Sequence, residues 1–309
     1  MEDGGGILKS KGKIIIANTG DDTLTLLDSK NREIIDILDL KSIKNNSPIG
    51  PYELIDTESN LVYCTNIYDN SLYKINIDTK ELIDILYIGC YPSCIKHFKD
   101  NFYIVNTDSN SISVINVEEF SLIESIPVGD KPTDIEIDKT NMKIYVANSN
   151  DCSISKIDLI KNESTTIRLK NNPLKIILEG NHMYILFNAN GSLSYKSNIS
   201  IMNLETLEIE NILDLRGIFN TMLKINTSEI IFTTNIGNGC LYRMDIKKGS
   251  LLSKTNLLGL PNKLAWDGDE TIYITNISTN TLSLFDTKTN RIICDIKVGM
   301  EPNGILFFN

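Results

Sequence analysis

The chain has 309 residues, of which 41% are hydrophobic and 23% charged, and its formal net charge is −10. These proportions are typical of a globular protein with an ample core rather than of a disordered or membrane-embedded chain. The acidic surface repels phosphate groups, which disfavours nucleic acid and anionic membranes as partners. We therefore expect a soluble protein, monomeric, whose partner is another protein, a glycan or a small molecule.

The N-terminus begins MEDGGG and contains no apolar run, so neither a signal peptide nor a membrane span is predicted. We assign residues 1–12 to an N-terminal tail and residues 13–309 to one domain. A cytoplasmic location follows by default. Delivery to a cell or spore surface without a classical signal peptide is the alternative.

One motif recurs along the chain and is clearest in residues 143–158. Residues 143–147 (KIYVA) form a short apolar strand that ends at Asn148, and residues 153–157 form a second strand that ends at Asp158. An Asn closes the first strand in seven units, at intervals of 40 to 48 residues: Asn18, Asn66, Asn106, Asn148, Asn188, Asn235 and Asn276. This interval is typical of a propeller blade.

Two further positions define each unit. An acid or amide lies ten residues after the Asn in six units, and in the unit of Asn188 the partner is Asn203, because five residues are inserted. A Pro precedes each unit except one, in which Asn220 substitutes: Pro51, Pro92, Pro132, Pro173, Pro261 and Pro302. Pro can open a strand because the first residue need not donate to the ladder. Each unit is therefore predicted to be a four-stranded antiparallel sheet whose innermost strand begins at that Pro.

The strands are apolar on both faces, which only ring closure can bury. The chain starts with the second strand of a unit, residues 13–17, and stops after an innermost strand, residues 302–308. We predict an all-β fold, a seven-bladed β-propeller closed by the C-terminal innermost strand, which completes the first blade. Residues 6–10 are the competing choice for that strand, but they lack the Pro and the spacing.

Two insertions interrupt the regular units, at residues 41–50 and 188–198. The first connects an outermost strand to the next innermost strand, and the second connects the second and third strands of a blade. Because strand direction alternates, both connections are expected on one face, which the Pro turns share. Long polar loops on a rigid scaffold often carry function, so this face is the predicted functional face.

The repeats resemble the YVTN-type propeller family. The resemblance lies in IYVANS (residues 144–149), FYIVNT (102–107) and IYITNI (272–277), together with Val-Gly-x-x-Pro turns such as residues 128–132. Similar propellers include surface-layer and adhesion proteins, lactonase-like hydrolases and streptogramin-inactivating lyases. The resemblance implies that the repeated Asn residues are structural, and we expect each to cap a turn through hydrogen bonds to the backbone.

Function is expected where the units differ, at the mouth of the central channel. The first and second positions after each Pro are polar and variable. Nine of these residues are candidate ligand-binding residues: Tyr52, Glu53, Ser93, Thr133, Asp134, Lys175, Asn262, Lys263 and Asn303. Glu53 and Asp134 could ligate a divalent cation such as Ca²⁺ or Mg²⁺ that polarises a substrate carbonyl, as the lactonase-like resemblance implies. Because no third ligand is evident, a solvated mouth with scattered charge and no cofactor is favoured.

Other reactive side chains are few. His97 and His182 lie on no recognisable catalytic motif, which disfavours a streptogramin-lyase-like site. Cys90 and Cys94 are separated by three residues in a loop, and a structural role is favoured over a redox or metal pair. Trp266, the only Trp, could stack on a ligand in the channel, but filling space between blades is favoured.

The absence of a catalytic constellation in the sequence favours a protein that is not an enzyme. We predict a non-enzymatic binding or scaffold propeller that presents its loop face and channel mouth to a protein, glycan or small ligand. The alternative is a metal-assisted hydrolase or lyase acting on a lactone or cyclic ester.

Overall fold

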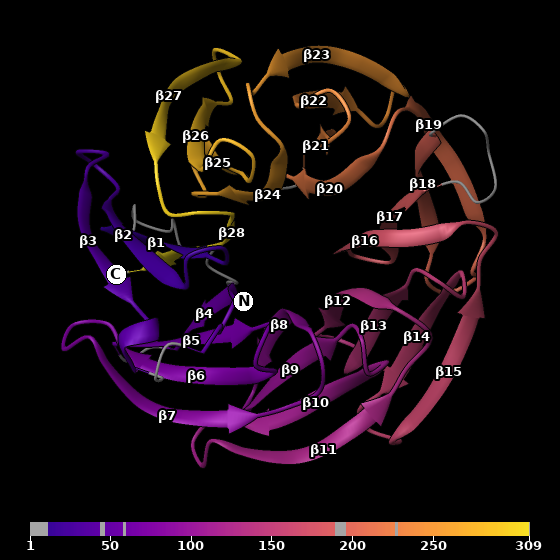
Figure 1. Cartoon of the computed structure of the whole chain (residues 1–309). Helices are drawn as coiled ribbons and strands as arrows, with labels where there is room; N and C mark the ends of the chain where they lie inside the picture. The colour runs from indigo at the N-terminus through magenta and orange to yellow at the C-terminus, as the bar shows by residue number, and fades with distance from the viewer. Residues whose placement is uncertain (1–11, 44–46, 58–59, 189–195, 226–227, 309) are drawn as a thin grey trace, which may run out of the picture.

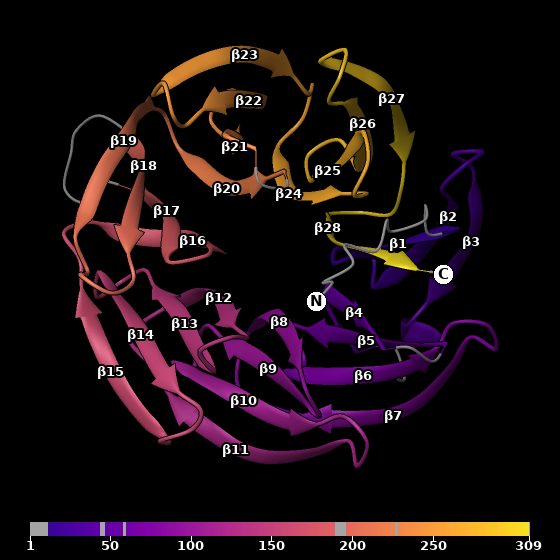
Figure 2. The same cartoon turned by 180° about the vertical axis from the view of Figure 1, so that it is seen from behind.

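The computed structural model describes residues 12–43, 47–57, 60–188, 196–225 and 228–308. These residues form 28 strands, arranged as seven four-stranded antiparallel sheets in a ring (Figures 1 and 2). The predicted seven-bladed β-propeller is therefore confirmed. Within the described residues, the one helical segment is a 3-10 turn, Lys41–Ile43, and no helix is long and apolar enough to cross a membrane.

In Figure 1, the first strand of each blade faces the axis and the fourth lies at the circumference. Blade 1 contains β28 (Pro302–Phe308), β1 (Lys13–Asn18), β2 (Thr23–Asp28) and β3 (Ile34–Asp39). Blades 2 and 3 contain β4 (Pro51–Asp56), β5 (Leu61–Asn66), β6 (Ser71–Asn76), β7 (Glu81–Tyr87), β8 (Pro92–Phe98), β9 (Asn101–Asn106), β10 (Ser111–Asn116) and β11 (Ser121–Pro127). Blades 4 and 5 contain β12 (Pro132–Asp138), β13 (Lys143–Asn148), β14 (Ser153–Asp158), β15 (Glu163–Arg168), β16 (Asn172–Glu179), β17 (His182–Asn188), β18 (Lys196–Asn203) and β19 (Ile209–Arg216). Blades 6 and 7 contain β20 (Phe219–Lys224), β21 (Ile230–Asn235), β22 (Cys240–Asp245), β23 (Ser250–Asn256), β24 (Pro261–Trp266), β25 (Thr271–Asn276), β26 (Thr281–Asp286) and β27 (Arg291–Lys297).

Ring closure occurs in blade 1, as the sequence predicts. The C-terminal strand β28 pairs with β1 in antiparallel register, with Lys13 opposite Phe308 and Ile16 opposite Ile305. Figure 1 shows the yellow β28 beside the indigo β1. The competing closing strand, residues 6–10, lies outside the described residues.

Seven hydrophobic clusters form the core, one between each pair of neighbouring blades. The cluster between blades 3 and 4, for example, includes Val105, Ile135 and Val146, all fully buried. Because each sheet contributes side chains to the clusters on both of its sides, both faces of every blade are buried. This arrangement explains the continuous apolar character of the second strands.

The register of two units differs from the sequence-based frame by one residue. Phe219, not Asn220, pairs with Asn235 and so takes the place of the strand-opening Pro. In blade 5, Phe187 pairs with Pro173, and Asn188 lies one residue further along β17, which has seven residues where β13 has six. A shift of one residue moves every later side chain to the opposite face of the sheet. The register is therefore set by how the strands pair, rather than by the type of residue at the motif position.

The repeated Asn residues bond mainly to side chains, which corrects the expected backbone capping. Asn148 Nδ2 donates to the hydroxyls of Ser153 and Ser155 on the next strand, at 3.0 Å each, and Asn18, Asn106 and Asn276 donate in the same pattern. Asn235 is the one that caps its turn as expected, accepting from two backbone N–H groups. The Asn side-chain NH₂ group therefore donates to hydroxyl groups five and seven residues later, in place of the carbonyl groups of the turn backbone.

The two insertions are only partly described. Residues 44–46 of the first predicted loop and residues 189–195, which are most of the second, lie outside the described residues. The remainder of the first connection meets the turn after β1, because Asp22 Oδ1 accepts from Ile49 N at 3.0 Å and from Gly50 N at 2.6 Å. These bonds place Ile49 and Gly50 beside the β1–β2 turn, as the alternation of strands requires.

Candidate functional site

The candidate site is built by a bulge that recurs in the innermost strands. The register shifts immediately after the opening residue, for example between Pro132 and Asp134 and between Pro51 and Glu53. A bulge places two consecutive residues against one partner residue and re-aims their side chains. Both variable positions after each Pro can therefore contribute to the channel.

The channel contains two cavities that share a constriction. The mouth cavity has a volume of about 240 Å³ and is lined by residues at the first position of six blades, including Tyr52, Thr133 and Asn262. The inner chamber has a volume of about 320 Å³ and is lined further along the innermost strands. Lys175, Thr221 and Lys263 line both cavities, so the second position forms the constriction between them.

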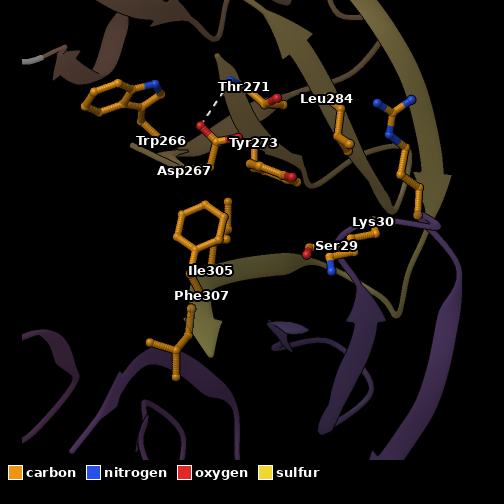
Figure 3. A pocket seen from close by; sticks show the side chains of 11 residues that line it. Ser29, Lys30, Trp266, Asp267, Thr271, Tyr273, Leu284, Ile305 and Phe307 are labelled. Atoms are coloured by element: carbon orange, nitrogen blue, oxygen red, sulfur yellow. Dashed lines mark hydrogen bonds between the residues drawn. The ribbon is translucent and has the colours of Figure 1, made fainter. Parts of the chain in front are cut away.

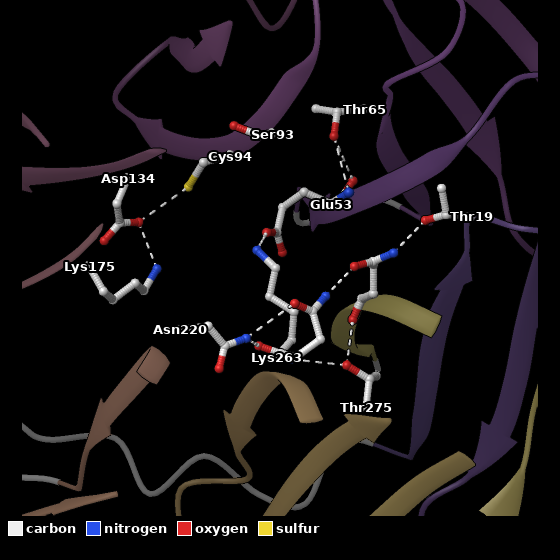
Figure 4. A network of polar contacts seen from close by, with 12 residues as sticks. Thr19, Glu53, Thr65, Ser93, Cys94, Asp134, Lys175, Asn220, Lys263 and Thr275 are labelled. Carbon is white, nitrogen blue, oxygen red and sulfur yellow. Dashed lines mark hydrogen bonds and ion pairs between the residues drawn. The ribbon is translucent and has the colours of Figure 1, made fainter. Parts of the chain in front are cut away.

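Two ion pairs occupy the constriction (Figure 4). Lys175 Nζ lies 2.6 Å from Asp134 Oδ1, which joins blades 4 and 5, and Lys263 Nζ lies 2.5 Å from Glu53 Oε2. The second pair joins blades 7 and 2, across the place of blade 1. Blade 1 has Gly304 at that position, where a Cβ would lie 2.5 Å from the backbone oxygen of Tyr52, so no side chain stands between the two partners.

Asp134 is the most enclosed charge in the channel. Its side chain is 0% exposed, and its second oxygen accepts from Ile176 N at 2.9 Å. The thiol of Cys94 lies 3.7 Å from Asp134 Oδ1 and is directed at it. The carboxylate therefore has partners from two neighbouring blades.

The charges of the constriction perturb one another in a consistent direction. Burial is the largest single influence on Lys263 and disfavours its charged form, but the charges of Glu53, Tyr52 and Cys94 and the hydrogen bond to Glu53 together outweigh burial, and the pKa of Lys263 is raised. Burial is also the largest influence on Lys175, and the charges of Asp134 and Cys94 together outweigh it and raise the pKa of Lys175. Both lysines are therefore firmly cationic at neutral pH, and neither is a candidate general base.

Cys94 is unsuited to be a nucleophile. Burial, followed by the charge of Asp134, raises the pKa of the Cys94 thiol to about 11. Cys90, the other cysteine of the GCYPSC segment, is exposed, whereas Cys94 is buried. A structural role for the two cysteines stays a prediction.

Two further ion pairs involve residues that line the inner chamber, Lys96 with Glu136 and Lys224 with Glu179, and the sequence did not single them out. Lys96 Nζ lies 2.9 Å from Glu136 Oε1, and Lys224 Nζ lies 2.6 Å from Glu179 Oε1. These residues are on innermost strands beyond the two positions compared above. Comparing the fourth position after each Pro would have shown Lys96 and Glu136 on neighbouring blades, whereas Lys224 and Glu179 occupy different positions and no such comparison would have paired them.

A chain of amides and hydroxyls follows the wall of the mouth. Asn262 Nδ2 donates to Asn303 Oδ1, Asn303 Nδ2 donates to Thr19 Oγ1 at 2.6 Å, and Thr19 Oγ1 donates to the Pro51 carbonyl at 2.7 Å. In the neighbouring blade 3, Ser93 and Thr107 share a hydrogen bond of 2.6 Å. The first three bonds link blades 7, 1 and 2, and all four hold polar groups in fixed positions.

The structure places the nine predicted site residues in different surroundings. Six line the mouth cavity: Tyr52, Ser93, Thr133, Lys175, Asn262 and Lys263. Glu53 lines the inner chamber, whereas Asp134 and Asn303 are buried behind the surface, 0% and 4% exposed. The sequence missed Tyr91 and Asn220, which also line the mouth, because Tyr91 precedes the Pro and Asn220 was assigned to the Pro position.

The residues present do not fit the predicted divalent cation. Glu53 and Asp134 each contact a different Lys, so their charges are already neutralised. Within the described ranges, no three His, Cys, Asp or Glu side chains are grouped so that they could hold a metal ion. His97 and His182 are absent from the linings of both channel cavities. No reaction step can be derived through a metal at these carboxylates.

Comparison with known proteins shows the fold. No family model and no curated protein sequence matches the chain. A protein from Lactobacillus plantarum aligns with a TM-score of 0.77 at 10% identity, over 96% of this chain and 99% of that chain. A putative 6-phosphogluconolactonase from Bacteroides fragilis aligns with a TM-score of 0.73 at 13% identity, over 99% and 100%. Virginiamycin B lyase from Staphylococcus aureus aligns with a TM-score of 0.67 at 16% identity, over 85% and 90%. At these identities, the similarity extends to the seven-bladed architecture alone.

Proposed function

We propose that this chain is a non-enzymatic binding propeller whose mouth cavity takes the end of a glycan or a comparable small, uncharged, polyhydroxylated ligand. The observation that supports this function most is the pairing of charges at the constriction. Glu53 and Lys263 neutralise each other, as do Asp134 and Lys175, so the mouth offers hydrogen-bonding groups without a net charge.

The lining of the mouth matches such a ligand. Hydroxyl groups and amides, such as those of Thr133, Asn220 and Asn262, can donate to and accept from sugar hydroxyls. Tyr52 and Tyr91 add an aromatic wall, with ring centroids 6.0 Å apart and planes tilted by 57°. A rigid cavity with a few convergent polar groups and aromatic surface is the usual form of a small-ligand site.

The enzymatic alternative lacks a specific observation in its favour. The resemblance to YVTN-type repeats and the structural similarity to a putative 6-phosphogluconolactonase and to virginiamycin B lyase keep hydrolysis and lyase activity among the outcomes to test. Among the channel residues that could act in such a reaction, Lys175 and Lys263 are cationic and the Cys94 thiol has a raised pKa. None of these is a base or a nucleophile at neutral pH.

The test is saturation-transfer NMR of the full chain with a panel of disaccharides, followed by calorimetry on any that bind. We expect a binder whose affinity falls at least about tenfold in Asn262→Ala and in Tyr52→Ala, since each loses contacts to the ligand. Tyr87→Ala is the matched control, because Tyr87 is 60% exposed on the outer strand β7 and lines neither channel cavity.

Equal affinity in Tyr52→Ala and Tyr87→Ala would contradict the proposal. So would turnover of γ-butyrolactone or a related cyclic ester that is lost in Glu53→Gln, because that result would make the constriction catalytic. The absence of any bound saccharide in the panel would also count against a glycan site.

A further inference from the structure

A third cavity lies where the ring closes, between blades 7 and 1 (Figure 3). We call it the seam cavity. Its volume is about 320 Å³, and its aromatic walls are Trp266 at the end of β24, Tyr273 in β25 and Phe307 in β28. The Tyr273 and Phe307 rings meet edge to face, with centroids 5.1 Å apart. Its lining includes the β2–β3 turn and the end of β24, which lie at the opposite end of the strands from the mouth cavity.

The interface between blades 2 and 3 shows why the seam is hollow. There, Tyr63 occupies the position of Tyr273, and it packs against Phe102 at 4.7 Å and Phe120 at 5.9 Å between ring centroids. Phe120 lies in the β10–β11 turn, with φ +49, and is 7% exposed. Two aromatic rings thus fill the space beside Tyr63.

At the seam, both filling rings are replaced. The position of Phe102 in the second strand is taken by Ile14, and the position of Phe120 in the turn is taken by Arg32, with φ +60. Arg32 is exposed and lines the rim of the seam cavity instead of filling it. A smaller aliphatic group and an outward-facing cation therefore leave a space that aromatic rings occupy in the other interface.

The rim of the seam cavity is cationic on one side. Lys30 and Arg32 come from the β2–β3 turn, and neither takes part in an ion pair within the part of the chain that the structure describes. Asp267 lies on the other side, beside Trp266 (Figure 3), where its Oδ1 accepts from Asp269 N at 2.8 Å and Thr271 N at 3.1 Å. On a chain of net charge −10, a paired cationic rim over an aromatic cavity is complementary to an anionic aromatic molecule.

We propose that the seam cavity binds a small aromatic carboxylic acid, with its ring between Trp266 and Phe307 and its carboxylate at Arg32. A guanidinium matches a carboxylate in geometry and charge, and the three aromatic side chains supply most of the contact area. The bound acid would contact both blade 7 and blade 1. It binds the closed ring only, and so it stabilises closure as well as occupying a site independent of the mouth.

Trp266 gives a direct readout because it is the only Trp in the chain. The probe is 4-nitrobenzoate, which quenches indole fluorescence, and its neutral partner is 4-nitrobenzamide, which has the same ring without the charge. We expect saturable quenching by the acid, with an affinity at least about fivefold higher than that of the amide. We also expect a melting temperature that rises with acid concentration.

Two variants of Arg32 distinguish the effect of its charge from the effect of the open volume of the seam cavity. Arg32→Gln keeps the cavity and should abolish the preference for acid over amide. Arg32→Phe copies the residue of the blade 2 and 3 interface and should abolish saturable quenching by both compounds while the melting temperature stays at or above that of the unchanged chain. Lys80→Gln is the matched control, because Lys80 occupies the equivalent turn position of blade 2, with φ +59, and should leave quenching unchanged.

Quenching that is linear and never saturates would overturn the proposal, because it would report collisions at an exposed indole. Equal affinity for acid and amide, or equal acid affinity in Arg32→Gln and Lys80→Gln, would overturn it as well. Because Trp266 lines no part of the channel, these results bear on the seam cavity alone and leave the mouth cavity to its own test.

Discussion

The channel shows how single residues make burial of charge tolerable. Asp134 is fully buried, yet one oxygen contacts Lys175 and the other accepts a backbone N–H from Ile176. A buried carboxylate is costly unless it is paired and hydrogen-bonded, and here both conditions hold. The pair therefore holds two neighbouring blades together at the constriction.

Removing one member of this pair should be more harmful than removing both. In Asp134→Asn, Lys175 loses its counter-ion while its side chain is only 26% exposed, and we expect the free energy of unfolding to fall by about 2–3 kcal/mol. Asp134→Asn combined with Lys175→Met should lose less than the sum of the two single variants. Urea unfolding of the four proteins measures this coupling, and strict additivity would contradict it.

The same lysine makes stability depend on pH at the alkaline end. The pKa of Lys175 is raised from its ordinary value of 10.5, so the folded state keeps a proton that the unfolded chain releases. The contribution of Lys175 to the free energy of unfolding is complete below pH values near that ordinary pKa. It is lost as the pH rises through the pKa of Lys175 in the folded state. Burial also raises the pKa of Tyr145 to about 12, which acts in the same direction.

We therefore expect the free energy of unfolding to decline as the pH rises above about 10. The decline should be shallower in Lys175→Met, which lacks the titrating amine, although tyrosines keep part of it. Urea unfolding at several alkaline pH values measures the slope, with Lys139→Met on the exposed β12–β13 turn as the control. Identical slopes in the two variants would rule out Lys175 as a source.

At the scale of an element, the Val-Gly-x-x-Pro turn and the repeated Asn form one unit. A Cβ at Gly129 would lie 2.6 Å from Asn148 Nδ2, and Gly89 and Gly299 stand equally close to Asn106 and Asn18. The Gly is needed because the amide lies directly against the turn backbone. Recurrence of the Gly and the Asn together therefore reflects packing between consecutive blades rather than a repeated ligand site.

Gly129→Ala should accordingly lower the free energy of unfolding by about 1–3 kcal/mol, because the added methyl group displaces Asn148 from its bonds to Ser153 and Ser155. Gly12→Ala is the control, since a Cβ there meets nothing within 4 Å and should change stability by less than about 0.5 kcal/mol. Thermal and urea unfolding of both variants measure the difference, and equal effects would show that the turn can relax.

At the scale of the whole molecule, stability depends on closing the ring in blade 1. Strand β28 pairs with β1 along its length, and Asn303 within it bonds to Thr19 and Asn262. The strand therefore links the two ends of the chain and also neighbours blade 7. Its loss would expose the faces of blades 7 and 2 that now pack against blade 1.

Deleting residues 302–309 should abolish cooperative unfolding, as followed by circular dichroism and urea titration. A circular permutant gives the matched control: joining residue 309 to residue 12 and cutting between Lys99 and Asp100 keeps every strand and moves the closing strand to blade 3. We expect the permutant to unfold cooperatively, because Phe308 already lies opposite Lys13. A truncated chain that melts like the intact one would show that closure is not required.

The fold could be predicted from the sequence because one motif repeats seven times. Seven copies of the Pro and Asn positions reveal the blade length, the strand order and the closing strand, because each blade must satisfy the same local geometry. One-residue errors at Asn188 and Asn220 arose because residue type resembles the motif there, while the register is set by pairing with strands elsewhere.

The sequence by itself determined the blade repeat and indicated the mouth of the channel, where six of the nine predicted residues line a cavity, because the positions after each Pro differ between otherwise equivalent blades. Only the tertiary structure decided which of those side chains meet: Lys263 reaches Glu53 because Gly304 of the intervening blade leaves room, and the two residues are 210 positions apart. The seam cavity likewise depends on Arg32 and Phe307 coming together at closure. The pattern of strand and turn residues is present in each repeat, and so the sequence alone reveals it. Contacts between different blades depend on the curvature of the whole ring, which no single repeat specifies.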